Sequence, residues 1–119
     1  MSVSILVVED EPIIRELLLE FLTRLGYQVL LADSGKEALE YLGNKQIQLA
    51  LVDLKLPDME GIEVIKQLKK INPKLTCIVM TAYPTPASQQ MAKELGVAAY
   101  LTKPFQLSNL QSLLEKALK

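Results

Sequence analysis

The segment Leu49-Ala50-Leu51-Val52-Asp53 is a short apolar run that ends at a carboxylate. It lacks the alternation of apolar and polar residues that a half-buried strand shows, and it is too short for a helix. It therefore predicts a strand that is buried on both faces of a parallel sheet. Similar runs lie on both sides of it, and together they predict a five-stranded parallel sheet. The five runs are Val3–Val8, Val29–Ala32, Leu49–Val52, Leu75–Met80 and Val97–Leu101.

Amphipathic segments with the periodicity of a helix separate these runs. Pro12 and Pro86 fall where first helical turns begin, with Thr85 as an N-cap. Strands that alternate with helices predict a doubly wound α/β domain, (βα)5, with the flavodoxin-like strand order 2-1-3-4-5. Three apolar stripes are Ile14, Leu17, Leu18, Phe21, Leu22 and Leu25, then Ile62, Ile65, Leu68 and Ile71, then Leu107, Leu110, Leu114 and Leu118. The glycines just past the expected helix ends are Gly26, Gly43 and Gly96.

Length and composition exclude several classes of protein. The 119 residues suit one domain, and 50% hydrophobic with 23% charged residues is typical of a globular chain. With a net charge of -1, no general positive field attracts nucleic acid or membrane surfaces. The absence of histidine excludes Ser-His-Asp triads and histidine-ligated zinc. Cys77 is the single cysteine, which excludes an internal disulfide. We expect a cytoplasmic protein without a signal peptide or a membrane span.

Polar residues gather after the predicted strands. The acidic stretch 9–11 follows the first strand, Asp53 the third and Thr81 the fourth, while Lys103 comes shortly after the fifth. Ligands of such sheets bind at the carboxyl ends of the strands, near the point where the strand order reverses. We therefore expect these side chains to share one site.

The predicted strand order places Asp10 and Asp53 on neighbouring strands, roughly 4.8 Å apart. Two carboxylates about 5 Å apart repel by roughly 3 kcal/mol at an effective dielectric near 20, so a proton, a lysine or a cation must offset the repulsion. Lys103 lies about 10 Å across the sheet, within the range of its flexible stem. An oxygen-only site of this kind suits Mg²⁺. A carboxylate in it can act as a nucleophile toward phosphorus and form an aspartyl phosphate.

Four motifs lie at four of the strand ends: ILVVEDE over 5–11, LVDLKLPDMEG over 51–61, VMTA over 79–82 and YLTKPF over 100–105. Together they resemble the receiver domain of bacterial two-component response regulators, of the single-domain, CheY-like kind. Each motif alone is weak evidence, but the four cover the whole chain in order and spacing. The resemblance implies one receiver domain over residues 1–119.

The resemblance implies the chemistry of the acidic residues. Asp53 would accept a phosphoryl group from a phosphohistidine of a sensor histidine kinase or a histidine phosphotransfer protein. Mg²⁺, or Mn²⁺ in its place, would be held by Glu9, Asp10, Asp53 and the main-chain carbonyl of Lys55. The protein would catalyse only its own phosphorylation and dephosphorylation, and would otherwise not be an enzyme.

The resemblance also implies how the phosphoryl group is sensed. Lys103 would pair with its oxygens, and the Thr81 hydroxyl with the Ala82 amide would bind it after transfer. Tyr100 would be a switch residue whose rotamer follows Thr81. The fourth helix, the fifth strand and the fifth helix would form the surface that a downstream effector binds, in a monomer or a weak phosphorylation-dependent dimer. The Lys103-Pro104 peptide bond is expected to be cis.

Some positions specialise the family pattern. Glu9 stands where aspartate is more usual, which lengthens one metal-binding arm. Lys55 and Tyr83 lie two residues after Asp53 and Thr81, and we predict that they shield the phosphoryl group from water and slow its hydrolysis. Pro84 and Pro86 stiffen a loop that moves in the family's switch.

Three other functions stay open as alternatives. A phosphatase of the haloacid dehalogenase kind also uses an aspartate nucleophile and Mg²⁺, but it needs a second aspartate where Lys55 stands. A flavodoxin-like FMN carrier is disfavoured because the acids at 9–11 would repel the phosphate. A receiver fold that serves only as a docking module, without phosphorylation, is the third. The sequence names neither the kinase, the stimulus nor the output.

Overall fold

Five parallel strands form one sheet in the order β2-β1-β3-β4-β5, which confirms the predicted topology. The computed structural model describes residues 3–44 and 46–118. Its strands are β1 (Ser4–Val8), β2 (Gln28–Ala32), β3 (Leu49–Asp53), β4 (Thr76–Thr81) and β5 (Ala99–Thr102). Its helices are α1 (Pro12–Arg24), α2 (Gly35–Asn44), α3 (Gly61–Ile71), α4 (Pro86–Glu94) and α5 (Leu107–Ala117). Both β3 and β4 extend one residue beyond the predicted runs, so Asp53 and Thr81 are their last residues.

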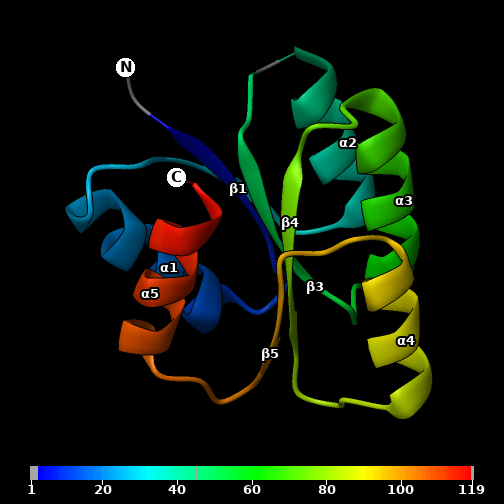
Figure 1. Cartoon of the computed structure of the whole chain (residues 1–119). Coiled ribbons are helices and arrows are strands. Elements are labelled where there is room, and N and C mark those ends of the chain that lie inside the picture. Colours follow the sequence, from blue (N-terminus) through cyan, green and yellow to red (C-terminus); the bar gives the residue numbers. More distant parts are fainter. Residues whose placement is uncertain (1–2, 45, 119) are drawn as a thin grey trace.

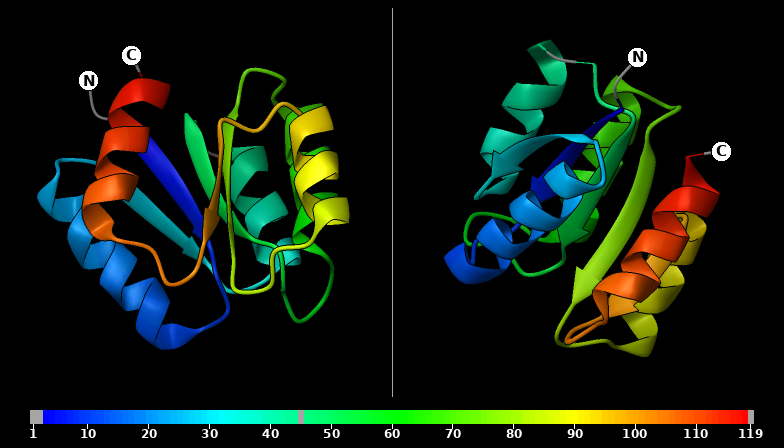
Figure 2. Two further views of the ribbon diagram at one scale, coloured as in Figure 1. Left: turned by 60° about the horizontal axis from the view of Figure 1, so that its bottom comes forward. Right: turned by 90° about the vertical axis from the view of Figure 1, so that its left-hand side faces the viewer.

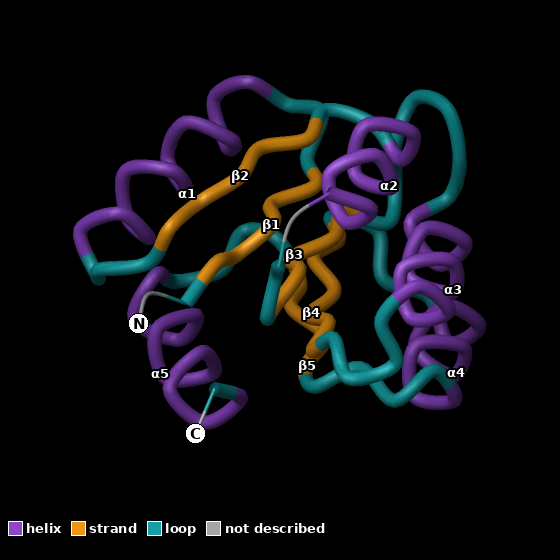
Figure 3. The backbone as a smooth tube through the Cα atoms, turned by 90° about the horizontal axis from the view of Figure 1, so that it is seen from above, coloured by secondary structure: helices purple, strands orange, loops and turns teal. Residues whose placement is uncertain are grey.

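The helices cover the sheet from both sides, as Figure 1 shows: α2, α3 and α4 lie on one face, and α1 and α5 on the other. Views from other directions show the same three layers (Figure 2; Figure 3). Successive strand side chains point to opposite faces, so Leu6 and Val8 belong to the core under α2, α3 and α4, while Ile5 and Val7 belong to the core under α1 and α5. Among the described residues, no helix has the length and apolar character needed to span a bilayer.

Helix boundaries follow the local sequence, with one exception. Pro12 and Pro86 occupy first turns, and Thr85 caps α4 by accepting a hydrogen bond from the Ser88 N–H at 3.0 Å. Gly26 and Gly96 have φ of 96° and 74°, a conformation that glycine adopts without steric cost. The prediction for Gly43 was wrong. This residue lies inside α2, which continues to Asn44.

The predicted apolar stripes are wider than the faces that are buried. Leu17 is 49% exposed and Ile71 is 52% exposed, although both have the helical spacing of core residues. Ile13 is 77% exposed at the start of α1. Each helix packs on the sheet along one narrow line, so residues at the margin of a stripe face solvent.

The segment after β3 is held close to β3 and α2. The Asp58 carboxylate accepts hydrogen bonds from the N–H groups of Gly35 and Lys36, both at 2.9 Å, and these bonds lower the pKa of Asp58. The Gly61 N–H donates to the carbonyl oxygen of Leu54 at 2.8 Å. These contacts fix the backbone on which Asp53 is carried.

Candidate functional site

The carboxyl ends of the strands bring the predicted site residues together. Asp53 ends β3 and Thr81 ends β4. Lys103 follows β5, and its backbone N–H donates to the carbonyl oxygen of Thr81 at 2.7 Å. Glu9 follows β1, and its N–H continues the sheet by donating to the carbonyl of Ala32 at 3.0 Å. The lysine and the acids thus reach one edge of the sheet from three different strands.

Three carboxylates form a cluster at this edge. One oxygen from each of Glu9, Asp10 and Asp53 lies within 4.8 Å of the others. Glu9 is 0% exposed and Asp53 is 6% exposed, whereas Asp10 is exposed. The proximity of Asp10 and Asp53 follows from the predicted strand order, but the complete burial of Glu9 does not. A side chain one residue beyond a strand gives no sequence signal of the depth at which it will lie.

Lys103 bridges two of the acids. Its Nζ lies 2.7 Å from Asp53 Oδ2 and also forms a close ion pair with Glu9 Oε1. Burial disfavours the charge on Lys103, but the hydrogen bonds to Asp53 and Glu9 outweigh burial and raise its pKa above the ordinary value. Burial raises the pKa of Glu9 to about 7, against the lowering effect of the Lys103 hydrogen bond. The ammonium therefore offsets repulsion between the Glu9 and Asp53 carboxylates, whereas the repulsion predicted from the sequence was between Asp10 and Asp53.

The remaining contacts orient Asp53 and Thr81. Asp53 Oδ1 accepts a hydrogen bond from the Lys55 N–H at 2.9 Å, so both carboxylate oxygens have a donor. Thr81 is buried, and its Oγ1 accepts from the Tyr83 N–H at 3.0 Å. Ala82 and Lys103 line one cavity of about 330 Å³ between α1 and the segment after β5. The Lys103-Pro104 peptide bond is cis, as expected.

The side chains of Lys55 and Tyr83 contact each other. The Lys55 Nζ lies 4.6 Å from the centroid of the Tyr83 ring, within the range of a cation–π interaction. The Tyr83 side chain is 68% exposed, so the pair lies at the solvent boundary. The pair joins the segment after β3 to the segment after β4. The sequence predicted that both residues lie near Asp53, but not that they contact each other.

Two contacting residues were not identified from the sequence. Arg15 Nη1 donates to the carbonyl oxygens of Glu9 at 3.1 Å and Asp10 at 3.2 Å, so α1 holds the acidic loop in place. Ser88 Oγ lies 2.7 Å from the hydroxyl oxygen of Tyr100. The sequence contained a usable signal for Ser88 alone of the two. It lies three residues after the N-cap Thr85, which is the spacing of a capping box.

The cluster fits a hard divalent cation. Three carboxylates with no nitrogen or sulfur ligand are the donor set that Mg²⁺ prefers. The main-chain carbonyl of Lys55 stays a predicted fourth ligand. Lys103 competes with a metal ion for the same carboxylates, so either the ammonium or a bound metal cation can balance the negative charge of the site.

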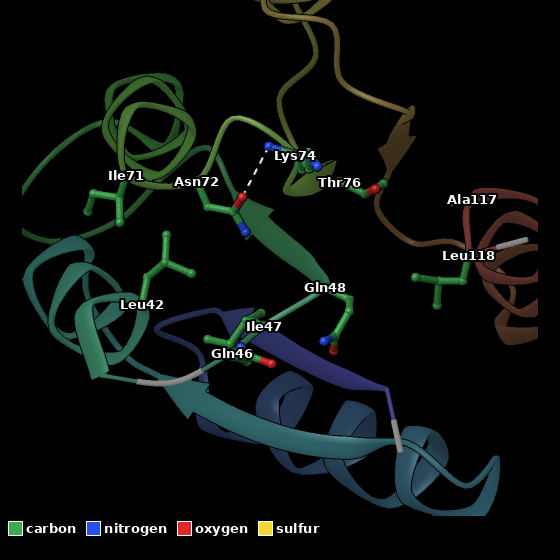
Figure 4. A pocket seen from close by; sticks show the side chains of 10 residues that line it. All are labelled: Leu42, Gln46, Ile47, Gln48, Ile71, Asn72, Lys74, Thr76, Ala117 and Leu118. Atoms are coloured by element: carbon green, nitrogen blue, oxygen red, sulfur yellow. Dashed lines mark hydrogen bonds between the residues drawn. The ribbon is translucent and has the colours of Figure 1, made fainter. Parts of the chain in front are cut away.

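A larger hollow lies at the opposite end of the sheet (Figure 4). Its volume is about 510 Å³, and it lies near the beginning of β3 and β4, beside Gln48 and Thr76. Among the described residues that line it, none is acidic and Lys74 is charged. This hollow has no contact with the acidic cluster and provides none of the chemistry predicted from the sequence.

Comparisons with known proteins show the family to which the chain belongs. Residues 5–115 match the family model described as the response regulator receiver domain. The chain is 37% identical over 118 residues to sporulation initiation phosphotransferase F of Bacillus subtilis (strain 168), covering 99% of this chain and 95% of that protein. It is 38% identical over 117 residues to the transcriptional regulatory protein ZraR of Escherichia coli (strain K12), covering 98% of this chain but only 26% of ZraR.

A solved structure supports the same relationship. The CheY-like response regulator receiver domain protein from Methanospirillum hungatei JF-1 superposes with a TM-score of 0.93 at 32% sequence identity. The match covers 98% of this chain and 94% of that one. The two proteins therefore share the fold over almost their whole length.

Proposed function

Because the chain belongs to the response regulator receiver domain family, we propose that it accepts a phosphoryl group on Asp53 and transmits the event as a conformational change. Receiver domains are phosphoryl-accepting signalling modules of two-component and phosphorelay systems rather than enzymes with separate substrates. The observation that carries the proposal is the placement of Asp53, buried between the Lys103 ammonium, Glu9 and Asp10. We propose that residues 1–119 form one such domain.

In the proposed transfer, an oxygen of Asp53 attacks the phosphorus of a phosphohistidine on the partner. The new O–P bond forms as the P–N bond breaks, and the electron pair of the broken bond goes to the imidazole nitrogen of the donor. The Lys55 N–H and Lys103 Nζ orient the Asp53 carboxylate before the donor arrives. Mg²⁺ or Mn²⁺, held by Glu9, Asp10, Asp53 and the Lys55 carbonyl, supplies neutralisation of phosphoryl charge when bound.

After transfer, the residues around Asp53 bind the phosphoryl oxygens. Lys103 pairs with one of them, and the Ala82 amide donates to another. The Thr81 hydroxyl accepts its present hydrogen bond from the Tyr83 N–H, so its proton is available for the phosphoryl group. Movement of Thr81 is followed by Tyr100, which changes the surface formed by α4, β5 and α5. A downstream effector binds that surface.

The partners follow from this chemistry. The donor is a sensor histidine kinase or a histidine phosphotransfer protein in the cytoplasm, and the acceptor of the signal is an effector protein. The domain itself contacts neither nucleic acid nor membrane, and is a monomer or a weak dimer that forms on phosphorylation. ZraR is named a transcriptional regulatory protein, and this chain spans about a quarter of its length.

The proposal is tested by incubating the protein with acetyl phosphate and Mg²⁺ and measuring the intact mass. We expect a gain of one phosphate for the wild-type chain and none for Asp53→Ala. A gain in both proteins places the acceptor elsewhere. A gain in neither identifies the chain as a docking module that uses the receiver fold without phosphorylation.

Lys55 and Tyr83 are proposed to slow hydrolysis of the phosphoryl group. Their cation–π contact joins the segments that follow Asp53 and Thr81, so the double variant Lys55→Asn with Tyr83→Ala should admit water to Asp53 more readily. We expect the phosphorylated double variant to lose its label about fivefold faster, the rate change that corresponds to about 1 kcal/mol in the barrier. Decay of the phosphorylated mass over time measures this. Lys66→Asn, an exposed lysine on α3, is the control, and equal lifetimes in all three proteins would contradict the proposal.

A further inference from the structure

Ser88 connects the start of α4 to Tyr100 on β5. Its Oγ lies 2.7 Å from the Tyr100 hydroxyl, and both side chains are half-buried. Ser88 is the third residue of α4 and also completes the capping box with Thr85. A single hydroxyl therefore takes part both in the helix cap and in the contact between α4 and β5.

The hydrogen bonds of Ser88 leave its hydroxyl fully used. Besides Tyr100, its Oγ lies near three atoms of Thr85: N at 3.3 Å, Oγ1 at 3.1 Å and O at 3.1 Å. A serine hydroxyl has one proton to donate and two lone pairs. In one assignment that uses the whole hydroxyl, Thr85 N–H and Tyr100 O–H donate to Ser88 Oγ, and Ser88 donates its own proton to Thr85. Moving Tyr100 away then removes one of the hydrogen-bond partners of Ser88 Oγ.

The segment between Thr81 and Ser88 is suited to pass on a displacement. Thr81 Oγ1 bonds to the Tyr83 N–H at 3.0 Å, and the N-cap Thr85 follows two residues later. Pro84 restricts the backbone of this short connection because its φ is fixed. A pull on Thr81 toward Asp53 is therefore transmitted to the first turn of α4, which carries Ser88.

Room for a moved side chain lies beside this turn. A hollow of about 300 Å³ is lined by residues that include Thr81, Ser88 and Met91. In the arrangement described here, Lys103 bonds directly to Asp53 and Ser88 bonds to Tyr100. A phosphoryl group on Asp53 would displace the first of these contacts.

We propose that Ser88 is a positioning residue of the switch, whose hydroxyl holds Tyr100 in the arrangement that precedes phosphorylation and so sets the cost of activation. This inference rests on the proposed function of Asp53 and deepens it, because it names a residue that regulates the same site. Removal of the bond destabilises the resting arrangement relative to the activated one. Binding of an acyl phosphate mimic should then become tighter.

The test measures the affinity of the whole chain for beryllofluoride with Mg²⁺ by calorimetry, in wild type, Ser88→Ala, Tyr100→Phe and the double variant. We expect each single variant to bind about fivefold more tightly, the effect of losing one hydrogen bond from the resting state. The double variant should bind no more tightly than Tyr100→Phe. Ser88→Thr keeps the hydroxyl and should restore the wild-type affinity.

The helix cap provides a separate readout. Loss of the capping-box bond that the Ser88 hydroxyl accepts from the Thr85 N–H should lower thermal stability for Ser88→Ala in both the wild-type and the Tyr100→Phe background. The affinity should change only where the Tyr100 hydroxyl is present. Unchanged affinity in Ser88→Ala, or an equal change in both backgrounds, would overturn the inference and leave the proposed function intact. If wild type binds no beryllofluoride, the proposed function fails and the inference fails with it.

Discussion

Replacement of Lys103 with methionine is expected to lower the free energy of unfolding by about 3 kcal/mol at about pH 8 in the presence of EDTA. Methionine keeps most of the apolar stem and removes the ammonium. Glu9 is 0% exposed, so without Lys103 its carboxylate and that of Asp53 would be buried together with no cation between them. Urea unfolding followed by circular dichroism measures the loss.

The free energy of unfolding of this variant should also depend on pH in a different way from that of wild type. Burial raises the pKa of Glu9 to about 7 from its ordinary 4.5, so the folded chain binds this proton more tightly than the unfolded chain. The contribution of Glu9 to stability therefore falls as the pH rises between these two values. Lys103 lowers the pKa of Glu9, so Lys103→Met should extend the fall to higher pH. The difference in the free energy of unfolding between Lys103→Met and wild type should become smaller as the pH falls toward about 4.5.

The same variant should bind Mg²⁺ severalfold more tightly than wild type, because the ammonium no longer competes for Glu9 and Asp53. Calorimetric titration with Mg²⁺ alone measures this without any phosphoryl donor. Lys66→Met, which removes an exposed lysine from α3, should change stability by less than about 0.5 kcal/mol and leave Mg²⁺ affinity as it is. If Lys103→Met were as stable as this control across the pH range, Lys103 would not be balancing the acidic cluster.

Substitution of alanine for Gly61 is expected to cost about 3 kcal/mol and to disturb Asp53 at the same time. A Cβ at this position would lie 2.6 Å from the Leu54 Cα and 2.9 Å from the carbonyl carbon of Asp53. Both are backbone atoms, and the hydrogen bond from the Gly61 N–H to the Leu54 carbonyl holds them close. The clash can be relieved only by moving the end of β3. We expect lower stability in urea and slower phosphorylation by acetyl phosphate.

Gly43 is the matched control for this substitution. It lies inside α2, and a Cβ there would meet no atom of the described residues within 4 Å. Gly43→Ala should therefore raise stability by about 0.4–1 kcal/mol, since alanine restricts the unfolded chain and favours the helix. Equal stability of the Gly61→Ala and Gly43→Ala variants would show that β3 and the start of α3 are not packed as described.

Most of the architecture could be read from local patterns. The five apolar runs predicted the strands to within two residues, and Pro12, Pro86 and Thr85 marked helix starts correctly. These signals are local because they depend on backbone conformation and on which side of an element is apolar. Gly43 and Ile71 show the limit. Whether a helix ends at a glycine depends on contacts with segments that are distant in the sequence. The same is true of whether a residue of an apolar stripe is buried.

The site divides in the same way. Residue types and their order along the chain placed Asp10, Asp53, Thr81 and Lys103 at one edge of the sheet, because carboxyl ends of parallel strands must share an edge. The sequence did not predict which acid would be fully buried, or that Lys103 would bridge Glu9 to Asp53. These features depend on contacts between distant positions, since Lys103 lies 94 residues from Glu9 and 50 residues from Asp53. The pairing of Ser88 with Tyr100 is of the same kind. Folding alone fixes such contacts, since burial and hydrogen-bond partners arise when separate elements pack together.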